Sequence, residues 1–325
     1  MRTAIGLERK SLIFVVLIQF MERKNPLQYV VLVLKGMAMG AADVVPGVSG
    51  GTIAFISGIY EEFITSINNI NLDLLKTLKK DGFKLAWKQL NGNFLLALFL
   101  GIAISIFSLA KFLSWLLVNE PIFLWSFFFG LVLASIFFVG KAIEKWSAVT
   151  VLVLLLGAGV AYFITTLPPI ENTSSLPFLF LSGALAVCAM ILPGISGAFI
   201  LVLLGSYKTI LDAVHERDIK IVATVALGSV FGLLSFARLL KWMFKRYKNL
   251  TLALLTGFIL GSLNKIWPWK KILETRTFDE KVIPIKEQNI SPFNFDGDPQ
   301  IMYAVLLALL GFSLIFVLEK LATKK

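Results

Sequence analysis

Cysteine and histidine are almost missing from this chain, and charged residues are scarce. The 325 residues include one cysteine, Cys188, and one histidine, His215. A single cysteine excludes an internal disulfide, and a single histidine excludes a metal site built from several histidines. Asp, Glu, Lys and Arg make up 16% of the residues, whereas ordinary soluble domains carry about 25%. The composition argues against a soluble domain, and we expect neither a metal nor a cofactor.

Long apolar runs take the place of the missing charge. Hydrophobic residues make up 57% of the sequence, and the mean hydropathy is +0.83. A helix needs about 20 apolar residues to cross the hydrocarbon core of a bilayer. Several runs reach or approach that length: 94–118, 122–139, 148–166, 221–242 and 301–318. The sequence predicts an all-α polytopic membrane protein. Its net charge of +11 is then explained by a membrane, and we expect no nucleic-acid partner.

The sequence contains an internal repeat. Segment 36–60, GMAMGAADVVPGVSGGTIAFISGIY, aligns without a gap with segment 183–207, GALAVCAMILPGISGAFILVLLGSY. Both halves carry the motif P-G-x-S-G, formed by Pro46, Gly47, Ser49 and Gly50 in the first and by Pro193, Gly194, Ser196 and Gly197 in the second. The likeness continues into the next apolar runs, where Lys111 aligns with Arg238. We predict two related halves, 27–167 and 168–325, which follow an N-terminal segment, 1–26.

The charges of the loops indicate how the halves are oriented. If each P-G-x-S-G segment dips into the membrane and returns to its own side, each half crosses three times and the second half is inverted. The segments placed inside by this arrangement, such as 70–90 and 241–248, carry roughly twice as many Lys and Arg residues as those placed outside, in agreement with the positive-inside rule. We therefore predict an inverted-repeat transporter with re-entrant helical hairpins at 29–66 and 176–212, about six transmembrane helices and an outer loop, 265–300. Both termini are expected in the cytoplasm.

Two segments are expected at the cytoplasmic membrane surface. Residues 70–90 place apolar side chains at helical spacing among several lysines, which is typical of an amphipathic helix on an anionic leaflet. A solvated connector is the alternative. In segment 1–26, the apolar run SLIFVVLIQF is too short to span a membrane and lacks a convincing cleavage site, so we predict no cleaved signal peptide. Met21 is an alternative start.

Helix-breaking residues inside apolar segments indicate a binding site. Non-helical backbone at membrane depth survives only inside protein or beside water. Proline interrupts a helix, and glycine permits a tight turn, so Pro46, Gly47, Pro193 and Gly194 are predicted structural turns. A helix that restarts after such a turn presents free N–H groups and a positive dipole end to an anion. The predicted substrate-binding residues are Ser49, Gly50, Gly51, Thr52, Ser196 and Gly197. Close packing of small residues is the alternative explanation.

Charged side chains in the apolar segments extend this hypothesis. Ionisable residues within a membrane are costly and are functional candidates by default. The repeat places Lys111 towards the outer face and Arg238 towards the inner face, as further candidates for substrate binding or as anchors that reach the interface. Asp43, Glu61 and Glu62 are candidates for coupling to an ion. A return of the chain to water would explain Glu61 and Glu62 equally well.

The paired motifs DVVPGVSGGTIAFISGIYE and MILPGISGAFILVLLGSY are each followed by a span with Ser-x-x-Lys or Ser-x-x-Arg. With these features, the chain from about residue 27 resembles the bacterial polyprenyl-phosphate translocase family. The resemblance implies a multi-pass carrier in the bacterial inner membrane that returns undecaprenyl phosphate from the outer to the cytoplasmic leaflet, for reuse in cell-envelope glycan synthesis. It implies a polyprenyl-phosphate lipid as substrate. The basic segment 70–90 adds anionic membrane lipids as expected partners, and we expect a transporter and not an enzyme.

Two other classes of protein remain open. An ion-coupled secondary transporter or a channel for a small anion would use the same hairpins, and assays with soluble anions would identify it. A membrane enzyme such as a lipid phosphatase needs a nucleophile with acid and base groups. His215 stands alone in an outer loop, and the sequence has no clustered Asp, Glu and His signature. The sequence predicts no oligomeric state.

Overall fold

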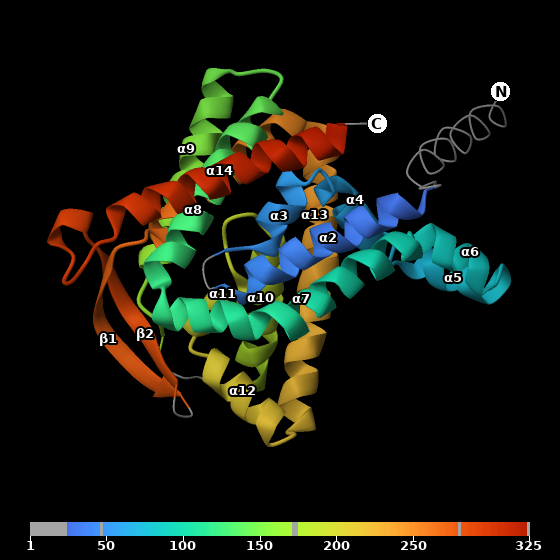
Figure 1. The fold of residues 1–325 in the computed structure, drawn as a ribbon. Coiled ribbons are helices and arrows are strands. Elements are labelled where there is room, and N and C mark those ends of the chain that lie inside the picture. The colour runs from blue at the N-terminus through green and yellow to red at the C-terminus, as the bar shows by residue number, and fades with distance from the viewer. Residues whose placement is uncertain (1–24, 46–47, 171–174, 279–280, 324–325) are drawn as a thin grey trace.

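The computed structural model describes residues 25–45, 48–170, 175–278 and 281–323. Helices form most of this part of the chain, and two strands lie at one end (Figure 1). The first half contains α2 (Pro26–Val44), α3 (Gly50–Ile56), α4 (Tyr60–Asn68), α5 (Leu72–Lys80), α6 (Phe83–Leu90), α7 (Gly92–Asn119), α8 (Pro121–Lys141) and α9 (Ala148–Thr166). The second half contains α10 (Leu176–Ile191), α11 (Gly197–Leu203), α12 (Tyr207–His215), α13 (Ile219–Ser262), η1 (Leu263–Ile266), β1 (Lys270–Phe278), β2 (Lys281–Asn289), η2 (Pro292–Asn294) and α14 (Ile301–Thr323).

The protein is an all-α polytopic membrane protein, as the apolar runs predict. Among the described residues, five helices are long and apolar enough to cross a membrane, namely α2, α7, α8, α9 and α13. The pair α11 and α12 is bent by 105° and makes a sixth candidate. Many apolar side chains of these helices are exposed, for example Phe107, Phe163 and Leu227. A soluble protein would bury such side chains, whereas a bilayer solvates them.

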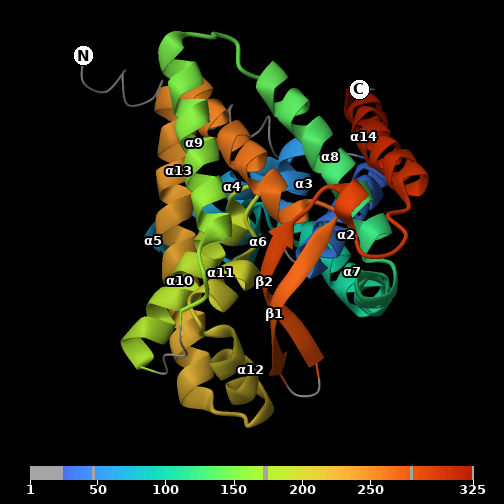
Figure 2. The same cartoon turned by 90° about the vertical axis from the view of Figure 1, so that its left-hand side faces the viewer.

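Helix α13 is two helices joined at a kink. Tyr247 has the non-helical angles φ −136° and ψ 47°. The limb 219–246 packs on α10, and the limb 248–262 packs on α9 (Figure 2). The segment 241–248 was expected to be a loop between two spans. The structure corrects this expectation, because the chain changes direction at Tyr247 and remains helical on both sides of it.

Contacts between helices follow the sequence repeat. In the first half, Gly36 of α2 lies directly against the carbonyl oxygen of Leu98 in α7. In the second half, Gly183 of α10 lies directly against the carbonyl oxygen of Val225 in α13. The alignment of the two halves pairs Gly36 with Gly183 and Leu98 with Val225. The two halves therefore pack their first two long helices through equivalent residues.

The later helices of the two halves are exchanged. Gly130 of α8 lies against the carbonyl oxygen of Ala308 in α14, and Gly257 of α13 lies against that of Leu154 in α9. Gly130 and Gly257 occupy equivalent positions in the repeat. Each half thus packs its last helix on a helix of the other half, so the halves interlock and do not form separate bodies.

Residues 70–90 form two short helices and not the single amphipathic helix that was expected. Gly82, with φ +85°, separates α5 from α6. A left-handed residue cannot continue an α-helix, and glycine adopts this conformation without strain. Leu72, Leu75 and Phe83 are exposed on these helices, which project from the rest of the molecule at the right of Figure 1.

The segment 265–300, expected to be an outer loop, contains a β-hairpin. Strands β1 and β2 are antiparallel, with Lys270 opposite Asn289. Two tryptophans close its base: Trp267 Nε1 donates to the carbonyl oxygen of Ile290 at 2.9 Å, and Trp269 Nε1 donates to that of Pro299 at 2.9 Å. The hairpin lies at the end of the molecule opposite α5 and α6 (Figure 1).

Candidate functional site

Both long helices that enter the centre of the molecule break at the P-G-x-S-G motif. Helix α2 ends before Val45, which is extended at φ −90° and ψ 117°, and α10 ends before Leu192, which is extended at φ −66° and ψ 131°. A following proline disfavours helical angles at both residues. Gly194 has φ +93° and makes the turn in the second half. Pro46 and Gly47, the corresponding predicted turn residues, lie outside the described residues.

The two breaks contact each other. Ser49 Oγ donates to the carbonyl oxygens of Leu192 at 3.1 Å and Met190 at 3.3 Å. In return, the backbone N–H of Gly194 donates to Thr52 Oγ1 at 2.9 Å. Both side chains are fully buried. Of the predicted substrate-binding residues, Ser49 and Thr52 therefore bind the opposite break through their hydroxyl groups.

A carboxylate from the same hairpin already occupies the start of α3. Asp43 Oδ1 accepts a hydrogen bond from the N–H of Gly50 at 2.7 Å, and Ser49 Oγ accepts one from the N–H of Gly51 at 3.1 Å. These are the donors that the sequence assigns to an external anion. Asp43, considered for ion coupling, thus lies at the first break and binds its backbone. The short helix is almost entirely buried, with only Phe55 partly exposed.

The second break differs from the first. The repeat places Met190 where the first half has Asp43, so the start of α11 has no equivalent carboxylate. Ser196 forms no side-chain capping hydrogen bond, and Gly197 is half-buried. Leu203 is the buried residue of α11. Two breaks with similar sequences therefore differ at the start of the second helix: side chains of Asp43 and Ser49 bind the first N–H groups of α3, whereas Ser196 does not cap α11.

The remaining predicted residues lie away from this contact. Lys111 on α7 and Arg238 on α13 are exposed. Each lies on the outer face of its helix and not in the protein interior, which is compatible with either predicted role, substrate binding or anchoring at the interface. Glu61 is exposed, and Glu62 Oε1 accepts a hydrogen bond from Asn91 Nδ2 at 3.0 Å. Neither glutamate joins the cluster formed by Asp43 and the two breaks.

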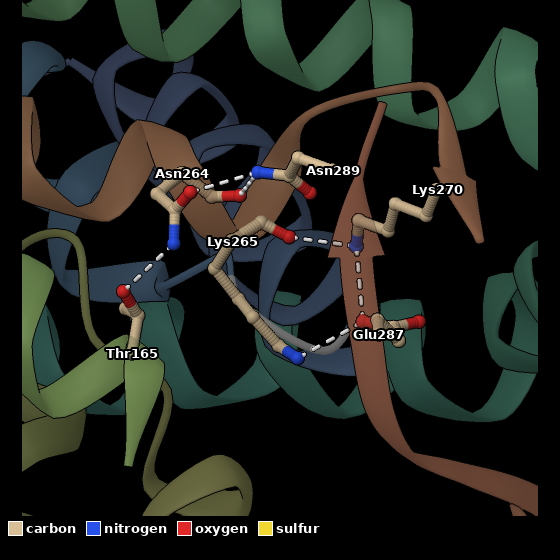
Figure 3. A network of polar contacts seen from close by, with 6 residues as sticks. All are labelled: Thr165, Asn264, Lys265, Lys270, Glu287 and Asn289. Carbon is tan, nitrogen blue, oxygen red and sulfur yellow. Dashed lines mark hydrogen bonds and ion pairs between the residues drawn. The ribbon is translucent and has the colours of Figure 1, made fainter. Parts of the chain in front are cut away.

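A second polar cluster lies between the β-hairpin and the helices (Figure 3). Glu287 Oε2 on β2 accepts hydrogen bonds from Lys265 Nζ at 3.0 Å and from Lys270 Nζ at 3.4 Å. Lys270 Nζ also donates to the carbonyl oxygen of Lys265 at 2.8 Å and lies 4.1 Å from the centre of the Trp125 ring. Asn289 Nδ2 binds the backbone and side-chain oxygens of Asn264 at 2.7 and 2.8 Å, which fixes the hairpin to η1.

Burial sets the charge properties of this cluster. The side chain of Lys270 is only 8% exposed. Removal from water lowers the pKa of Lys270 from 10.5 to about 8, although Glu287 partly opposes the change. Burial alone would raise the pKa of Glu287, but the ammonium groups of Lys270 and Lys265 hold the pKa below its usual range. At neutral pH, two cations therefore share one carboxylate.

Comparison with known proteins gives the family. Residues 39–282 match the VCA0040-like family, described as undecaprenyl phosphate translocase-like. The chain belongs to this family. Its relatives include a "Polyprenyl-phosphate transporter" of Vibrio cholerae serotype O1, 48% identical over 92% of this chain and 98% of the relative. A protein of the same name from Staphylococcus aureus is 32% identical over 73% of this chain and 85% of the relative. No solved structure matches the chain.

Within this translocase-like family member, sequence reasoning found the two breaks but missed the second cluster. Lys265, Lys270 and Glu287 lie in a segment that was taken for a loop. The alternation of polar and β-branched residues in 270–278 and 281–289 is a signal for strands that could have identified the hairpin. The pairing of Glu287 with both lysines follows only from the register of those strands.

Proposed function

We propose that this protein moves undecaprenyl phosphate from the outer to the cytoplasmic leaflet of the bacterial inner membrane. Such transport recycles the lipid carrier of cell-envelope glycan synthesis. Membership of the family and the names of both relatives support a polyprenyl-phosphate lipid as the substrate. The observation that carries the proposal in the structure is the contact between the two broken helices, in which Ser49 and Thr52 bind the opposite break.

We propose that this contact closes the path of the headgroup. A phosphate monoester is doubly charged and carries three strong acceptor oxygens, so it favours hydroxyl and backbone N–H donors. When the breaks separate, the hydroxyl groups of Ser49, Thr52 and Ser196 become donors for the headgroup, together with the backbone of Gly197. The N–H groups of Gly50 and Gly51 join them once Asp43 and Ser49 of the same hairpin release them. The polyprenyl tail remains in lipid throughout. The contact between the breaks is then the closed state of one central site.

Two exposed cations are proposed to receive the headgroup on either side of the membrane. In the inverted topology, Lys111 lies towards the outer face and Arg238 towards the cytoplasmic face. Arginine binds phosphate through two parallel hydrogen bonds, whereas lysine acts as a point charge. Exposure of both side chains in the described structure leaves them accessible to a lipid headgroup at the protein surface.

The proposed orientation places both termini, α5 and α6 in the cytoplasm. The excess of lysine and arginine in the inner loops supports it, and so do the equivalent contacts of Gly36 and Gly183, which agree with a repeated architecture. The exposed apolar side chains of α5 and α6 and their neighbouring lysines suit the surface of an anionic leaflet. We further propose a carrier and not an enzyme, since both relatives are named transporters.

Reconstituted liposomes test the proposed function. Purified protein is inserted into vesicles that carry undecaprenyl phosphate in one leaflet, and the fraction of headgroups reachable by an impermeant phosphatase is measured over time, with and without a pH gradient. Faster exchange than in protein-free vesicles supports the proposal. Exchange no faster than in those vesicles contradicts it, and uptake of soluble phosphate in place of lipid exchange would identify an anion carrier.

A further inference from the structure

A cavity of about 810 Å³ lies between the β-hairpin and the helices. We call it the hairpin cavity. One wall is polar and contains Lys265 of η1, Lys270 of β1 and Glu287 of β2. The facing wall is formed by α11, through Phe199 and Val202 among others. The volume lies in the range of about 300–1,000 Å³ that is typical of small-molecule sites.

The polar wall carries an excess of positive charge. Lys265 and Lys270 share one oxygen of Glu287, so the three side chains together carry a net positive charge. Each lysine ammonium group has three donors. Lys270 Nζ uses two of them, on the carbonyl oxygen of Lys265 and on Glu287 Oε2, whereas Lys265 Nζ uses one on Glu287 Oε2. Glu274 also borders the cavity, but its side chain is exposed to solvent. The remaining donors of Lys265, beside the buried charge of Lys270 and the open cavity, favour an anionic ligand.

Structural stabilisation alone does not account for this arrangement. When a buried ion cluster is replaced by apolar side chains, the stability of a protein often stays the same or increases. The cluster of Lys265, Lys270 and Glu287 is therefore not explained by a contribution to stability alone. Lys270 is also held in place independently of Glu287, by the carbonyl oxygen of Lys265 and by the ring of Trp125. The ammonium group would therefore keep its position if the carboxylate moved away.

The facing wall identifies the kind of anion. The cavity side of α11 is apolar, and Leu203 and Leu273 extend the apolar surface. A small inorganic anion gains nothing from such a wall, whereas an amphiphile places its charged head on the lysines and the start of its hydrocarbon tail on α11. The same short helix begins at the second break. A ligand in the cavity thus lies along the helix that leads to the proposed central site.

We propose that the hairpin cavity binds the headgroup and first tail units of a lipid phosphate monoester, with Lys265 and Lys270 as ligands and Glu287 as the internal carboxylate that the phosphate displaces. This inference deepens the proposed function and rests on it, because it assigns the same substrate to a site at the β-hairpin end of the molecule. Glu287 then acts as a placeholder that keeps the two lysines charged and oriented while the site is empty.

Binding to the full chain in detergent tests the proposal. The probes are a short-chain polyprenyl phosphate, the corresponding uncharged polyprenol and inorganic phosphate. Lys265→Ala and Lys270→Met each remove an ammonium group from the cavity and should weaken binding of the lipid phosphate about tenfold or more. Lys271→Ala is the matched control, because Lys271 is the next residue of the same strand and is exposed. It should change the affinity by no more than about twofold.

Glu287→Gln shows whether Glu287 is a carboxylate that the phosphate displaces or one that the fold requires. The glutamine keeps the size of the side chain but no longer competes with phosphate for the lysines. Because Glu287 also raises the pKa of the buried Lys270, binding is compared at pH 6.5, where affinity for the lipid phosphate should stay equal or rise. Thermal unfolding of each variant shows whether it is folded. If Lys270→Met does not fold, Lys265→Ala, whose lysine is partly exposed, still tests the site.

The outcomes distinguish this inference from the proposed function. Loss of binding in the lysine variants, with retention in Lys271→Ala and Glu287→Gln, supports the site. If Lys265→Ala and Lys270→Met fold and bind the lipid phosphate as tightly as the wild type does, the hairpin cavity is not the binding site. The proposed function survives that result, because the wild type still binds the lipid. Inorganic phosphate or polyprenol binding as tightly as the lipid phosphate overturns the assigned ligand. Failure of the wild type to bind lipid phosphate at all overturns the proposed function as well.

Discussion

Ser49 and Leu192 lie 143 residues apart in the chain and are joined by a hydrogen bond of 3.1 Å from the hydroxyl of Ser49 to the carbonyl oxygen of Leu192. Ser49 caps the start of α3, and Leu192 caps the end of α10. The residue that the motif assigns to the substrate thus holds the two broken helices together. In our proposal, substrate binding and this contact compete for the same hydroxyl group.

The two motif serines should therefore respond differently to substitution. Ser49→Ala removes the donor to the carbonyl oxygens of Met190 and Leu192 and the cap of α3, so the free energy of unfolding should fall by about 1–3 kcal/mol. Ser196→Ala removes no capping hydrogen bond and should leave stability nearly unchanged. Chemical denaturation of both variants in detergent measures the difference. Equal stability of Ser49→Ala and wild type would contradict a stabilising role for the contact.

Gly51 should be intolerant of even a methyl group. A Cβ atom at this position would lie 2.5 Å from the carbonyl oxygen of Ile191, and backbone cannot move aside as a side chain can. We expect Gly51→Ala to lower stability by about 1–3 kcal/mol through overpacking and to reduce the yield of folded protein. Gly159→Ala is the control, since nothing lies within 4 Å of the added atom. Similar yields and melting temperatures for both variants would show that the breaks are not tightly packed.

The sequence predicted the membrane-spanning helices and both helix breaks, because each depends on local properties. Apolar length decides whether a helix can cross a membrane, and proline acts on the residue directly before it, as at Val45 and Leu192. The partners of the broken segments could not be predicted in this way. The contact of Ser49 with Leu192 depends on how helices from the two halves of the chain pack, and that of Asp43 with Gly50 depends on how α2 and α3 fold back within one hairpin.

The β-hairpin was missed, and the sequence did not show which side of α7 and α13 carries Lys111 and Arg238, for a related reason. A charge inside an apolar run is compatible with either face of its helix, and only the packing of α7 and α13 decides which face is covered. Likewise, Lys265, Lys270 and Glu287 come together only after β1 and β2 pair in one register. Sequence periodicity can suggest the strands, but it does not show that a helix such as α11 faces them across a cavity.

The proposed orientation predicts which surface residues are reachable from outside the cell. In a Cys188→Ser background, Lys271→Cys on β1 should react with an impermeant maleimide on intact cells, because the β-hairpin lies outside. Lys84→Cys on α6 should react only after the membrane is opened. Both positions are exposed in the protein, so the membrane, and not the fold, is what separates them. The reverse labelling pattern would invert the topology.

Two substitutions of Asp43 distinguish a structural role, binding the N–H of Gly50, from a role in coupling transport to protons. Asp43→Asn keeps an oxygen that can accept the N–H of Gly50 but removes the charge, whereas Asp43→Ala leaves that buried N–H without its acceptor. We expect Asp43→Ala to destabilise the protein by about 1–3 kcal/mol and Asp43→Asn to fold nearly normally. If Asp43 couples transport to protons, lipid exchange by Asp43→Asn in liposomes should no longer respond to a pH gradient. A response equal to that of the wild type would remove Asp43 from the coupling candidates.

Lipid-phosphate binding should weaken as the pH rises through about 8, because Lys270 then loses its proton. Phosphate monoesters have a second pKa near 6, so the ligand is already doubly charged at pH 7.5 and does not contribute to the change. The titratable groups that face Lys270 or border the same cavity are Lys265, Glu287, Glu274, Tyr162 and Tyr207. Glu287, whose pKa the ammonium groups of Lys270 and Lys265 hold below its usual range, stays ionised throughout this titration.

Loss of the Lys270 proton at higher pH should change stability and lipid-phosphate binding in opposite directions. Between pH 8 and 10.5, the unfolded chain keeps the proton on Lys270 and the folded chain does not, so the contribution of Lys270 to the free energy of unfolding rises with pH. Over the same range the empty site loses a charge that the phosphate needs, and affinity should fall by up to about tenfold per pH unit. Titration of a short-chain polyprenyl phosphate from pH 6.5 to 9.5 measures the effect. Lys270→Met should bind weakly with a flat profile below pH 9, and a wild-type profile that is equally flat would show that Lys270 does not bind the headgroup.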